Sequence, residues 1–212
     1  VAIVTGAGGK FFCTGADLTD LPHTDGEGRE GSLESIAWTS LQNEVWKPVI
    51  CAVNGMAIGG GLHFVADSDI VIASQTATFF DTHVKLGLVA GLEPVSLARK
   101  MPMEAVLRMM LVGGKERMSA ARAYELGMVG EVVADDQLLN RAREVADMVK
   151  LHSPSAMAKT KKAIWQGADR GLTEAMQHAW QLIMAQNSHP DIEEGGRAFV
   201  EKRDPIWRPY NE

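Results

Sequence analysis

The stretch VICAVNGMAIGGGLHFVADSDIVIA, residues 49–73, decides the fold. Its β-branched start predicts a buried strand over residues 49–53, which the Asn-Gly pair at 54–55 ends. A short helix is predicted from about residue 60 to 66, and a second strand over 69–73. Three glycines before that helix allow a close backbone approach that a side chain would block. Because the first N–H groups of a helix lack partners within it, this stretch favours an oxygen that becomes negative during a reaction.

Composition places the chain among ordinary globular proteins. It has 212 residues, of which 46% are apolar and 23% charged, and a net charge of −6. The acidic balance, without a basic arm, argues against nucleic acid as a partner. No apolar run is long enough to span a membrane, and the six histidines lack the close spacing of a zinc site. With only Cys13 and Cys51, the sequence predicts a reduced, cytoplasmic protein that binds no metal and no membrane.

The remaining pattern indicates strand–helix units first and a helical tail after them. Further strands are predicted at 1–5, 77–80 and 130–133, and a helix from Pro94. Further helices are predicted over 33–45, 104–111, 119–126, 135–151, 155–167, 173–187 and 191–202. Ser119 is a suitable N-cap for its helix, and Gly127 a suitable stop. Because Val1 opens inside a strand, we expect an N-terminal portion ahead of it.

The glycine-rich loop after the first strand does not match a dinucleotide-binding loop. Residues 6–9 read G-A-G-G, which lacks the G-x-G-x-x-G spacing of such a loop, and no predicted helix follows directly. The sequence therefore does not favour a nicotinamide or flavin site at this position.

Two motifs go beyond a generic α/β pattern: F-C-T-G-A-D-L at 12–18 and A-V-N-G-M-A-I-G-G-G-L at 52–62. They are followed in order by A-D-S-D-I-V-I-A-S, M-S-A-A-R-A-Y-E-L-G-M-V-G-E-V-V and E-G-G-R-A-F-V-E-K-R-D-P. Together, over essentially the whole chain, these motifs strongly resemble the crotonase superfamily, the enoyl-CoA hydratase and isomerase family.

The resemblance implies an α/β fold, a crotonase-like spiral of ββα units. On this interpretation residues 1–150 form the spiral core, and residues 151–212 form a helical region that assembles the chain into trimers or hexamers. The family also carries residues ahead of the strand at Val1, so the resemblance implies that the start of the core is missing here.

The resemblance also implies an acyl-CoA substrate whose thioester carbonyl oxygen lies between two backbone N–H groups. Matched residue by residue, these groups belong to Ala16 and Gly60. Donors fixed in place before charge develops stabilise an enolate or a tetrahedral oxyanion. Coenzyme A then arrives as part of the substrate, and no separate cofactor is expected.

The sequence departs from the family at the two carboxylates that hydratases use. His63 and His83 stand at the two positions where those enzymes carry glutamate. Histidine transfers protons near neutral pH, so we expect both to replace the glutamates in proton transfer or water positioning. Asp67, four residues after His63 on the same helical face, is expected to orient it.

Three further sets of residues are weaker candidates. Asp81, two residues before His83, points to the same side of an extended segment. Glu93 acts either as an acid or as a helix-start charge. Phe199, Lys202 and Arg203 match family positions that contact the adenine and phosphates of CoA, and the alternative is a solvated charged helix end.

Two other functions stay open from the sequence. One is hydrolytic cleavage of a carbon–carbon bond in a β-diketone, as in 6-oxocamphor hydrolase, which has a histidine on the loop where His83 falls but lacks the intact glycine triplet. The other is a member that binds acyl-CoA without catalysis, having lost its carboxylates.

Overall fold

The computed structural model describes residues 1–17, 19, 33 and 36–210, which form two compact units. The larger unit contains residues 3–45 and 49–143, and the C-terminal unit contains residues 1–2, 46–48 and 144 onward. The predicted division between residues 150 and 151 stays a prediction. No helix within the described ranges is long and apolar enough to cross a membrane.

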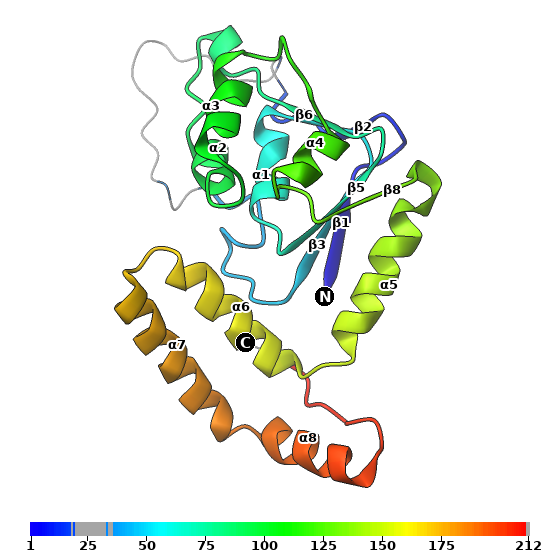
Figure 1. The fold of residues 1–212 in the computed structure, drawn as a ribbon, viewed down its shortest axis with the longest axis vertical. Coiled ribbons are helices and arrows are strands. Elements are labelled where there is room, and N and C mark those ends of the chain that lie inside the picture. Colours follow the sequence, from blue (N-terminus) through cyan, green and yellow to red (C-terminus); the bar gives the residue numbers. More distant parts are fainter. Residues whose placement is uncertain (18, 20–32, 34–35, 211–212) are drawn as a thin grey trace. The chain divides into compact units, whose positions relative to one another are not determined.

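Two four-stranded sheets form the framework of the larger unit (Figure 1). The first sheet has the order β1 (Ala2–Thr5), β3 (Val49–Val53), β5 (Ile70–Ser74) and β8 (Glu131–Val133). The second has the order β2 (Phe11–Cys13), β4 (Met56–Ile58), β6 (Thr78–Phe80) and β7 (Met118–Ser119). β2, β4 and β6 are parallel neighbours, whereas β7 runs antiparallel to β6. The ends of β2, β4 and β6 therefore meet at one edge.

Burial explains why residues 49–53 form the central strand. All five residues of β3 are buried, and β3 pairs in parallel with β5 from Ile50–Ile70 to Val53–Ala73. A strand enclosed on both faces is an almost continuous apolar run, which is the pattern that the sequence carries. The predicted strands at 49–53 and 69–73 are therefore confirmed, with β5 shifted by one residue.

Short helices cover the sheets and complete the core. A 3₁₀ turn (Gly59–Gly61) leads into α1 (Leu62–Ala66), and α2 (Leu92–Leu97), α3 (Met103–Leu111) and α4 (Ala120–Glu125) follow. Their apolar side chains join those of the strands in one buried cluster. The Ser119 side chain accepts a hydrogen bond from the Arg122 N–H, and Gly127 has φ +86°, so the predicted cap and stop of α4 are confirmed.

Lys100 connects the segment after α2 to the end of α1. Its Nζ donates to the carbonyl oxygens of Val65, at 3.1 Å, and Ser68, at 2.6 Å. A cation at the C-terminal end of a helix also opposes the helix dipole favourably. Burial lowers the pKa of Lys100, although neighbouring anionic groups act in the opposite direction. The contact fixes α1 relative to the segment that carries α2.

The predicted helix over residues 33–45 is wrong for its described part, 36–45, where the chain forms turns. The Gln42 side chain accepts hydrogen bonds from the Trp38 and Thr39 N–H groups, and Glu44 has φ +52°. Side chains that bond the backbone locally compete with a helix. Smaller differences are that β2, β4 and β7 were not predicted, and that α2 begins at Leu92 rather than Pro94.

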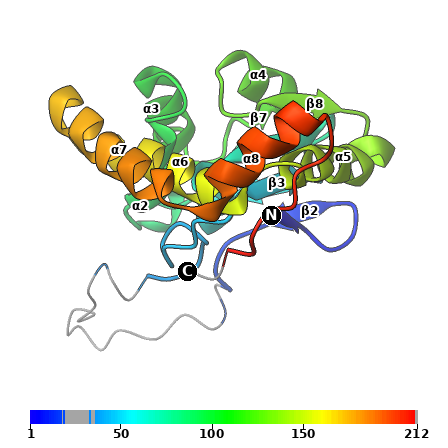
Figure 2. The same ribbon diagram turned by 90° about the horizontal axis from the view of Figure 1, so that it is seen from below.

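Four helices occupy the end of the chain. They are α5 (Leu138–Lys150), which begins in the larger unit, α6 (Pro154–Gly167), α7 (Leu172–Asn187) and α8 (Pro190–Glu201). α6 and α7 run side by side as a hairpin (Figures 1 and 2). Proline at the first turn of α6 and of α8 suits positions whose N–H would lack a helical partner. All four helices were predicted to within a few residues.

Candidate active site

A hollow of about 470 Å³ lies where β2, β4 and β6 end. Its lining residues follow those strands directly or come from the loop after β6: Thr14, Gly15, Ala16, Asp17, Gly59, Gly60, Thr82, His83, Leu86 and Leu88. Parallel strands commonly place a binding site at their carboxyl ends, because the loops that leave neighbouring strands converge there. The hollow therefore contains both predicted amide donors and one of the two predicted histidines.

The backbone at Gly15 approaches the backbone at Gly60 closely. A Cβ atom on Gly15 would lie 3.0 Å from the Gly60 nitrogen, and one on Gly60 would lie 3.9 Å from the Ala16 nitrogen. Gly15 also has φ +84°, a backbone conformation that residues other than glycine rarely adopt. The fold thus brings the amides of Ala16 and Gly60 together at one hollow, as their predicted use requires.

Each glycine of the triplet is needed for a different reason. Gly59 has φ +52°, and a Cβ on it would lie 3.4 Å from the His83 ring. Gly60 faces the backbone of Gly15. A Cβ on Gly61 would lie 2.2 Å from the carbonyl oxygen of Cys13, so no side chain fits there. The triplet is therefore required for two reasons: Gly61 packs against β2, and Gly59 and Gly60 leave room for His83 and Gly15 at the hollow.

Asp81 holds His83 in a defined orientation. Both oxygens of this fully buried carboxylate accept hydrogen bonds from His83, one from the backbone N–H at 2.8 Å and one from Nδ1 at 2.7 Å. Because an ionised carboxylate only accepts, the hydrogen of a neutral His83 ring lies on Nδ1. Nε2 then carries the lone pair, and His83 lines the hollow. Asp81 therefore prepares His83 to accept a proton at Nε2.

His63 occupies a different environment from His83. It lies in α1 with only 2% of its surface exposed, and its Nε2 is 3.3 Å from Glu93 Oε1. The Trp38 ring packs edge-on against it, with centroids 5.2 Å apart. The sequence predicted two imidazoles beside one substrate, and the structure places only His83 among the lining residues.

Glu93, at the start of α2, lies next to both histidines. Its Oε1 is 3.3 Å from His63 Nε2 and 3.9 Å from His83 Nε2, and the residue is 5% exposed. Burial by itself raises the pKa of Glu93, but the hydrogen bond from His63, the Glu93 backbone N–H and the charges of both rings outweigh it and hold the pKa below its usual value. Glu93 is therefore an anion between the two rings.

The expected pairing of Asp67 with His63 needs correction. The buried Asp67 carboxylate accepts a hydrogen bond from Thr39 Oγ1 at 2.7 Å, and its backbone N–H donates to the His63 carbonyl. The Asp67 backbone therefore continues the helical hydrogen-bond pattern of α1, but its carboxylate bonds Thr39 instead of the His63 ring. Glu93, from a separate helix, contacts the ring instead.

Several residues that line the hollow were not predicted from the sequence. Thr14 and Thr82 lie one and two residues after β2 and β6, so their position at neighbouring strand ends would have indicated them. Leu86 and Leu88 carried no such signal. Among the described residues, no group of three or more His, Cys, Asp or Glu side chains is arranged to hold a metal ion.

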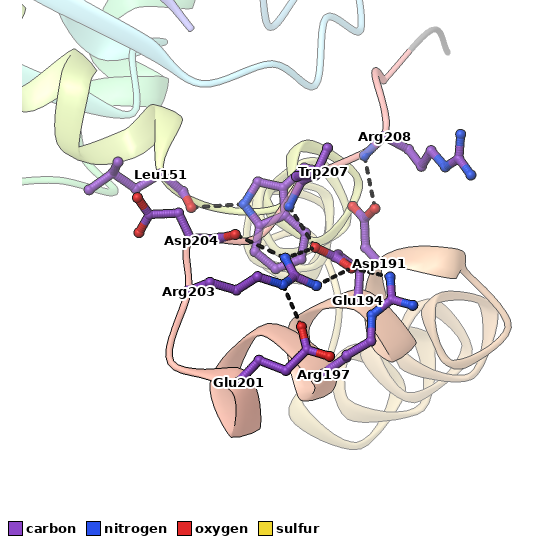
Figure 3. Close-up of polar contacts among 10 residues, drawn as sticks. Leu151, Asp191, Glu194, Arg197, Glu201, Arg203, Asp204, Trp207 and Arg208 are labelled. Carbon is purple, nitrogen blue, oxygen red and sulfur yellow. Dashed lines mark hydrogen bonds and ion pairs between the residues drawn. The ribbon is translucent and has the colours of Figure 1, made fainter.

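The predicted CoA-contacting residues lie in the C-terminal unit, at the end of α8. Phe199 is 86% exposed, and Lys202 is exposed at the helix end with φ +53°. The Arg203 guanidinium binds the Glu194 carboxylate, with contacts of 2.6 and 3.0 Å, and Glu201 at 2.6 Å (Figure 3). Arg203 therefore already has two carboxylate partners within its own unit, and a CoA-binding role for these three residues stays a prediction.

Glu194 is the centre of this C-terminal network. It accepts hydrogen bonds from Arg203, from the Ile206 N–H and from Arg197, in this order of effect, and they hold its pKa well below the usual range. The backbone beyond α8 is also held by the Trp207 Nε1 hydrogen bond to the Leu151 carbonyl and by the Arg208 N–H bond to Asp191 (Figure 3).

Replacing Glu194 with glutamine is expected to lower the melting temperature and to speed amide exchange at Ile206. The pKa of Glu194 is lower in the folded protein than its ordinary value of 4.5, so the carboxylate stabilises the fold fully above pH 4.5. This stabilisation is lost progressively as the pH falls from 4.5 toward the folded-state pKa. The difference between the wild type and Glu194→Gln should be largest at pH 7 and shrink toward pH 3. Glu193→Gln on the same helix is the control. An equal difference at both pH values would contradict this account.

Comparison with known proteins identifies the family. The model of the enoyl-CoA hydratase/isomerase family matches residues 1–209. The chain belongs to the enoyl-CoA hydratase/isomerase family. The predicted crotonase superfamily and the predicted enzyme class, a hydratase/isomerase-type enzyme that processes acyl-CoA, are therefore confirmed.

Individual members of the enoyl-CoA hydratase/isomerase family give the degree of similarity. The chain is 35% identical over 217 residues to (E)-benzylidenesuccinyl-CoA hydratase of Thauera aromatica, covering 98% of this chain and 81% of that protein. It is 37% identical over 218 residues to mevalonyl-coenzyme A hydratase of Aspergillus fumigatus, covering 99% and 78%.

A solved structure of the family confirms the fold. The crystal structure of an enoyl-CoA hydratase/isomerase from Mycobacterium paratuberculosis matches with a TM-score of 0.85 and 45% identity, covering 97% of this chain and 79% of that one. The predicted α/β crotonase-like architecture with a helical C-terminal region is therefore confirmed for this family member.

Proposed function

We propose that the protein adds water reversibly across the α,β double bond of an acyl-CoA thioester. The observation that carries this proposal is the hollow itself, which combines Ala16 and Gly60, whose backbones lie close together, with His83. Relatives named as hydratases of benzylidenesuccinyl-CoA and mevalonyl-CoA support the reaction type. The acyl group itself is not assigned by these observations.

The reaction proceeds in two proton transfers through one residue. The thioester carbonyl oxygen accepts hydrogen bonds from the Ala16 and Gly60 N–H groups, and a water molecule lies against His83 Nε2. As the water oxygen attacks the β carbon, its proton moves to Nε2 and the electrons of the double bond move onto the carbonyl oxygen as an enolate. The imidazolium then returns that proton to the α carbon. One C–O and one C–H bond form, and one O–H bond and the carbon–carbon π bond are lost.

A second candidate is migration of the double bond along the acyl chain. It is favoured by the presence of a single histidine among the lining residues, because one base is sufficient to take a proton from the α carbon of a 3-enoyl thioester and return it to the γ carbon. The same two amides would hold the dienolate oxygen. This reaction needs no water in the hollow.

Cleavage of a β-diketone and acyl-CoA binding without catalysis have less support than hydration or double-bond migration. Neither is favoured, because the named relatives are hydratases of CoA thioesters and the glycine triplet is intact. We further propose that no separate cofactor takes part and that coenzyme A enters as part of the substrate.

We also propose a cytoplasmic homotrimer or hexamer. One face of α7 supports this assembly, because its large apolar side chains are exposed in the single chain, with Leu172 at 80%, Met176 at 66% and Trp180 at 59%. Exposed apolar faces of this kind usually mark protein contacts. Sedimentation equilibrium would give the mass of the assembly, and a monomer would contradict the proposal.

The function is tested by offering 2-enoyl-CoA and 3-enoyl-CoA thioesters, the corresponding free acids and a cyclic β-diketone in parallel. We expect the 2-enoyl-CoA thioesters to gain the mass of one water, and the free acids to remain unchanged. Conversion of the 3-enoyl into the 2-enoyl thioester without a mass change would favour the second candidate. Turnover of the diketone alone would overturn both.

A further inference from the structure

Glu93 stands between the two histidines and is contributed by an element separate from both. It lies in the first turn of α2, His63 lies in α1, and His83 follows β6. We propose that Glu93 is a positioning residue that stabilises the protonated His83 ring during turnover, and that His63 holds Glu93 in place and does not itself transfer a proton. This inference rests on the function proposed above, in which His83 carries the proton.

Burial separates the roles of the two rings. His63 is 2% exposed and is covered by the edge of Trp38, whereas the side chain of His83 is 23% exposed and lines the hollow. A substrate in the hollow therefore meets His83 and not His63. The Nε2 atom of His63 lies 3.3 Å from Glu93 Oε1. Among the described residues, this carboxylate is the polar partner of the His63 ring.

A buried carboxylate such as Glu93 needs a partner. Placing an anion at 5% exposure without compensation is costly, and a hydrogen bond from an imidazole provides it. The net lowering of the Glu93 pKa, despite its burial, is consistent with this role of His63. His63 therefore has a structural reason to occupy a position at which we predicted a catalytic group.

Two carboxylates lie beside the ring of His83. Asp81 accepts from Nδ1 at 2.7 Å, and Glu93 Oε1 lies 3.9 Å from Nε2. Asp17 lines the same hollow, and His63 faces His83 only through Glu93. An opposite charge within about 4 to 6 Å favours a charged imidazole. The Glu93 carboxylate therefore stabilises a proton on Nε2.

The test compares three glutamine variants in the full chain with a 2-enoyl-CoA thioester as substrate. Glu93→Gln keeps the size and removes the charge, so we expect kcat to fall about 10- to 100-fold and the acid limb of the kcat profile to move to lower pH by about one unit. His63→Gln keeps an N–H near the position of Nε2. We expect it to retain kcat within about threefold and to leave the limb in place. His83→Gln is the benchmark for loss of proton transfer.

The outcomes separate this inference from the proposed function. If the wild type does not hydrate the thioester, the proposed function fails. If the wild type is active and His83→Gln retains that activity, proton transfer by His83 fails, and the inference on Glu93 fails with it. If His83→Gln is inactive but Glu93→Gln has an unchanged kcat and pH limb, only the role of Glu93 fails. If His63→Gln is as inactive as His83→Gln, His63 transfers a proton and the inference is wrong.

A folding defect in Glu93→Gln would not end the test. Glu93→Asp keeps the charge and shortens the side chain by one methylene, so it is expected to keep the pH limb of the wild type even if kcat falls. A limb in Glu93→Asp displaced to lower pH by a full unit would overturn the electrostatic role. Melting curves of all variants show which of them are folded.

Discussion

Replacing His83 with glutamine is expected to lower kcat for the hydration of a 2-enoyl-CoA thioester by about 10³-fold. A positioned acid–base group typically contributes 10²- to 10⁴-fold, and in the proposed mechanism His83 accepts and returns the same proton. Glutamine retains a similar shape and an N–H, but it cannot take up a proton at neutral pH. KM should change much less than kcat, because the side chain lost acts mainly on the transition state.

Asp81→Asn tests the same step through the orientation of the ring. The asparagine amide can donate to Nδ1, which places the hydrogen on Nε2 and removes the lone pair of Nε2. We expect a loss in kcat of about 10²-fold or more, because a wrongly protonated imidazole cannot act as the base. Lys85→Gln, an exposed change in the 3₁₀ turn (Val84–Leu86) that follows His83, is the control. If His83→Gln and Asp81→Asn, tested as single variants, both keep full activity, His83 takes no part in the mechanism.

Most of the fold was predictable because each of its central elements carries one clear local signal in the sequence. β3 is a buried apolar run that ends at an Asn-Gly turn, and α4 has a serine cap and a glycine stop. The region 36–45 was not predictable from apolar spacing, because local bonds from Gln42 and Asn43 satisfy backbone groups that a helix would use. Hydrophobic periodicity does not measure such competition.

The candidate site was predictable only in part. The amides of Ala16 and Gly60 were predicted from the two glycine motifs, and His83 from its position four residues before Gly87, where the family carries a glutamate. The structure places all three among the residues that line one hollow. The contact of Glu93 with His63 joins residues thirty positions apart, on two helices whose relation is set by packing, including the Lys100 contact. Spacing in the sequence contains no information on that distance. The four-residue spacing suggested Asp67 instead, but the Asp67 carboxylate bonds Thr39, a contact between residues far apart in the sequence.

Replacing Gly15 with alanine is expected to lower kcat by about 10²- to 10³-fold while changing substrate binding less. The added Cβ would lie 3.0 Å from the Gly60 nitrogen, so the chain at residues 15–16 must move away from Gly60. The two amides then no longer converge on one oxygen. Loss of one such donor costs about 3 to 4 kcal/mol of transition-state stabilisation, which corresponds to this change in rate. The effect appears in kcat because the negative charge develops only along the reaction.

Gly8→Ala separates this displacement from backbone strain. Gly8 has φ +75°, close to the +84° of Gly15, but a Cβ on it would meet nothing within 4 Å. Both variants should lose about 1 to 2 kcal/mol of stability to the left-handed backbone, and only Gly15→Ala should lose catalysis. Exchange of the α proton of a saturated acyl-CoA in deuterium oxide measures enolate formation without the water step, and it should slow in Gly15→Ala alone. If Gly8→Ala slows exchange equally, the loss comes from strain, and the amides of Ala16 and Gly60 do not form the oxyanion hole.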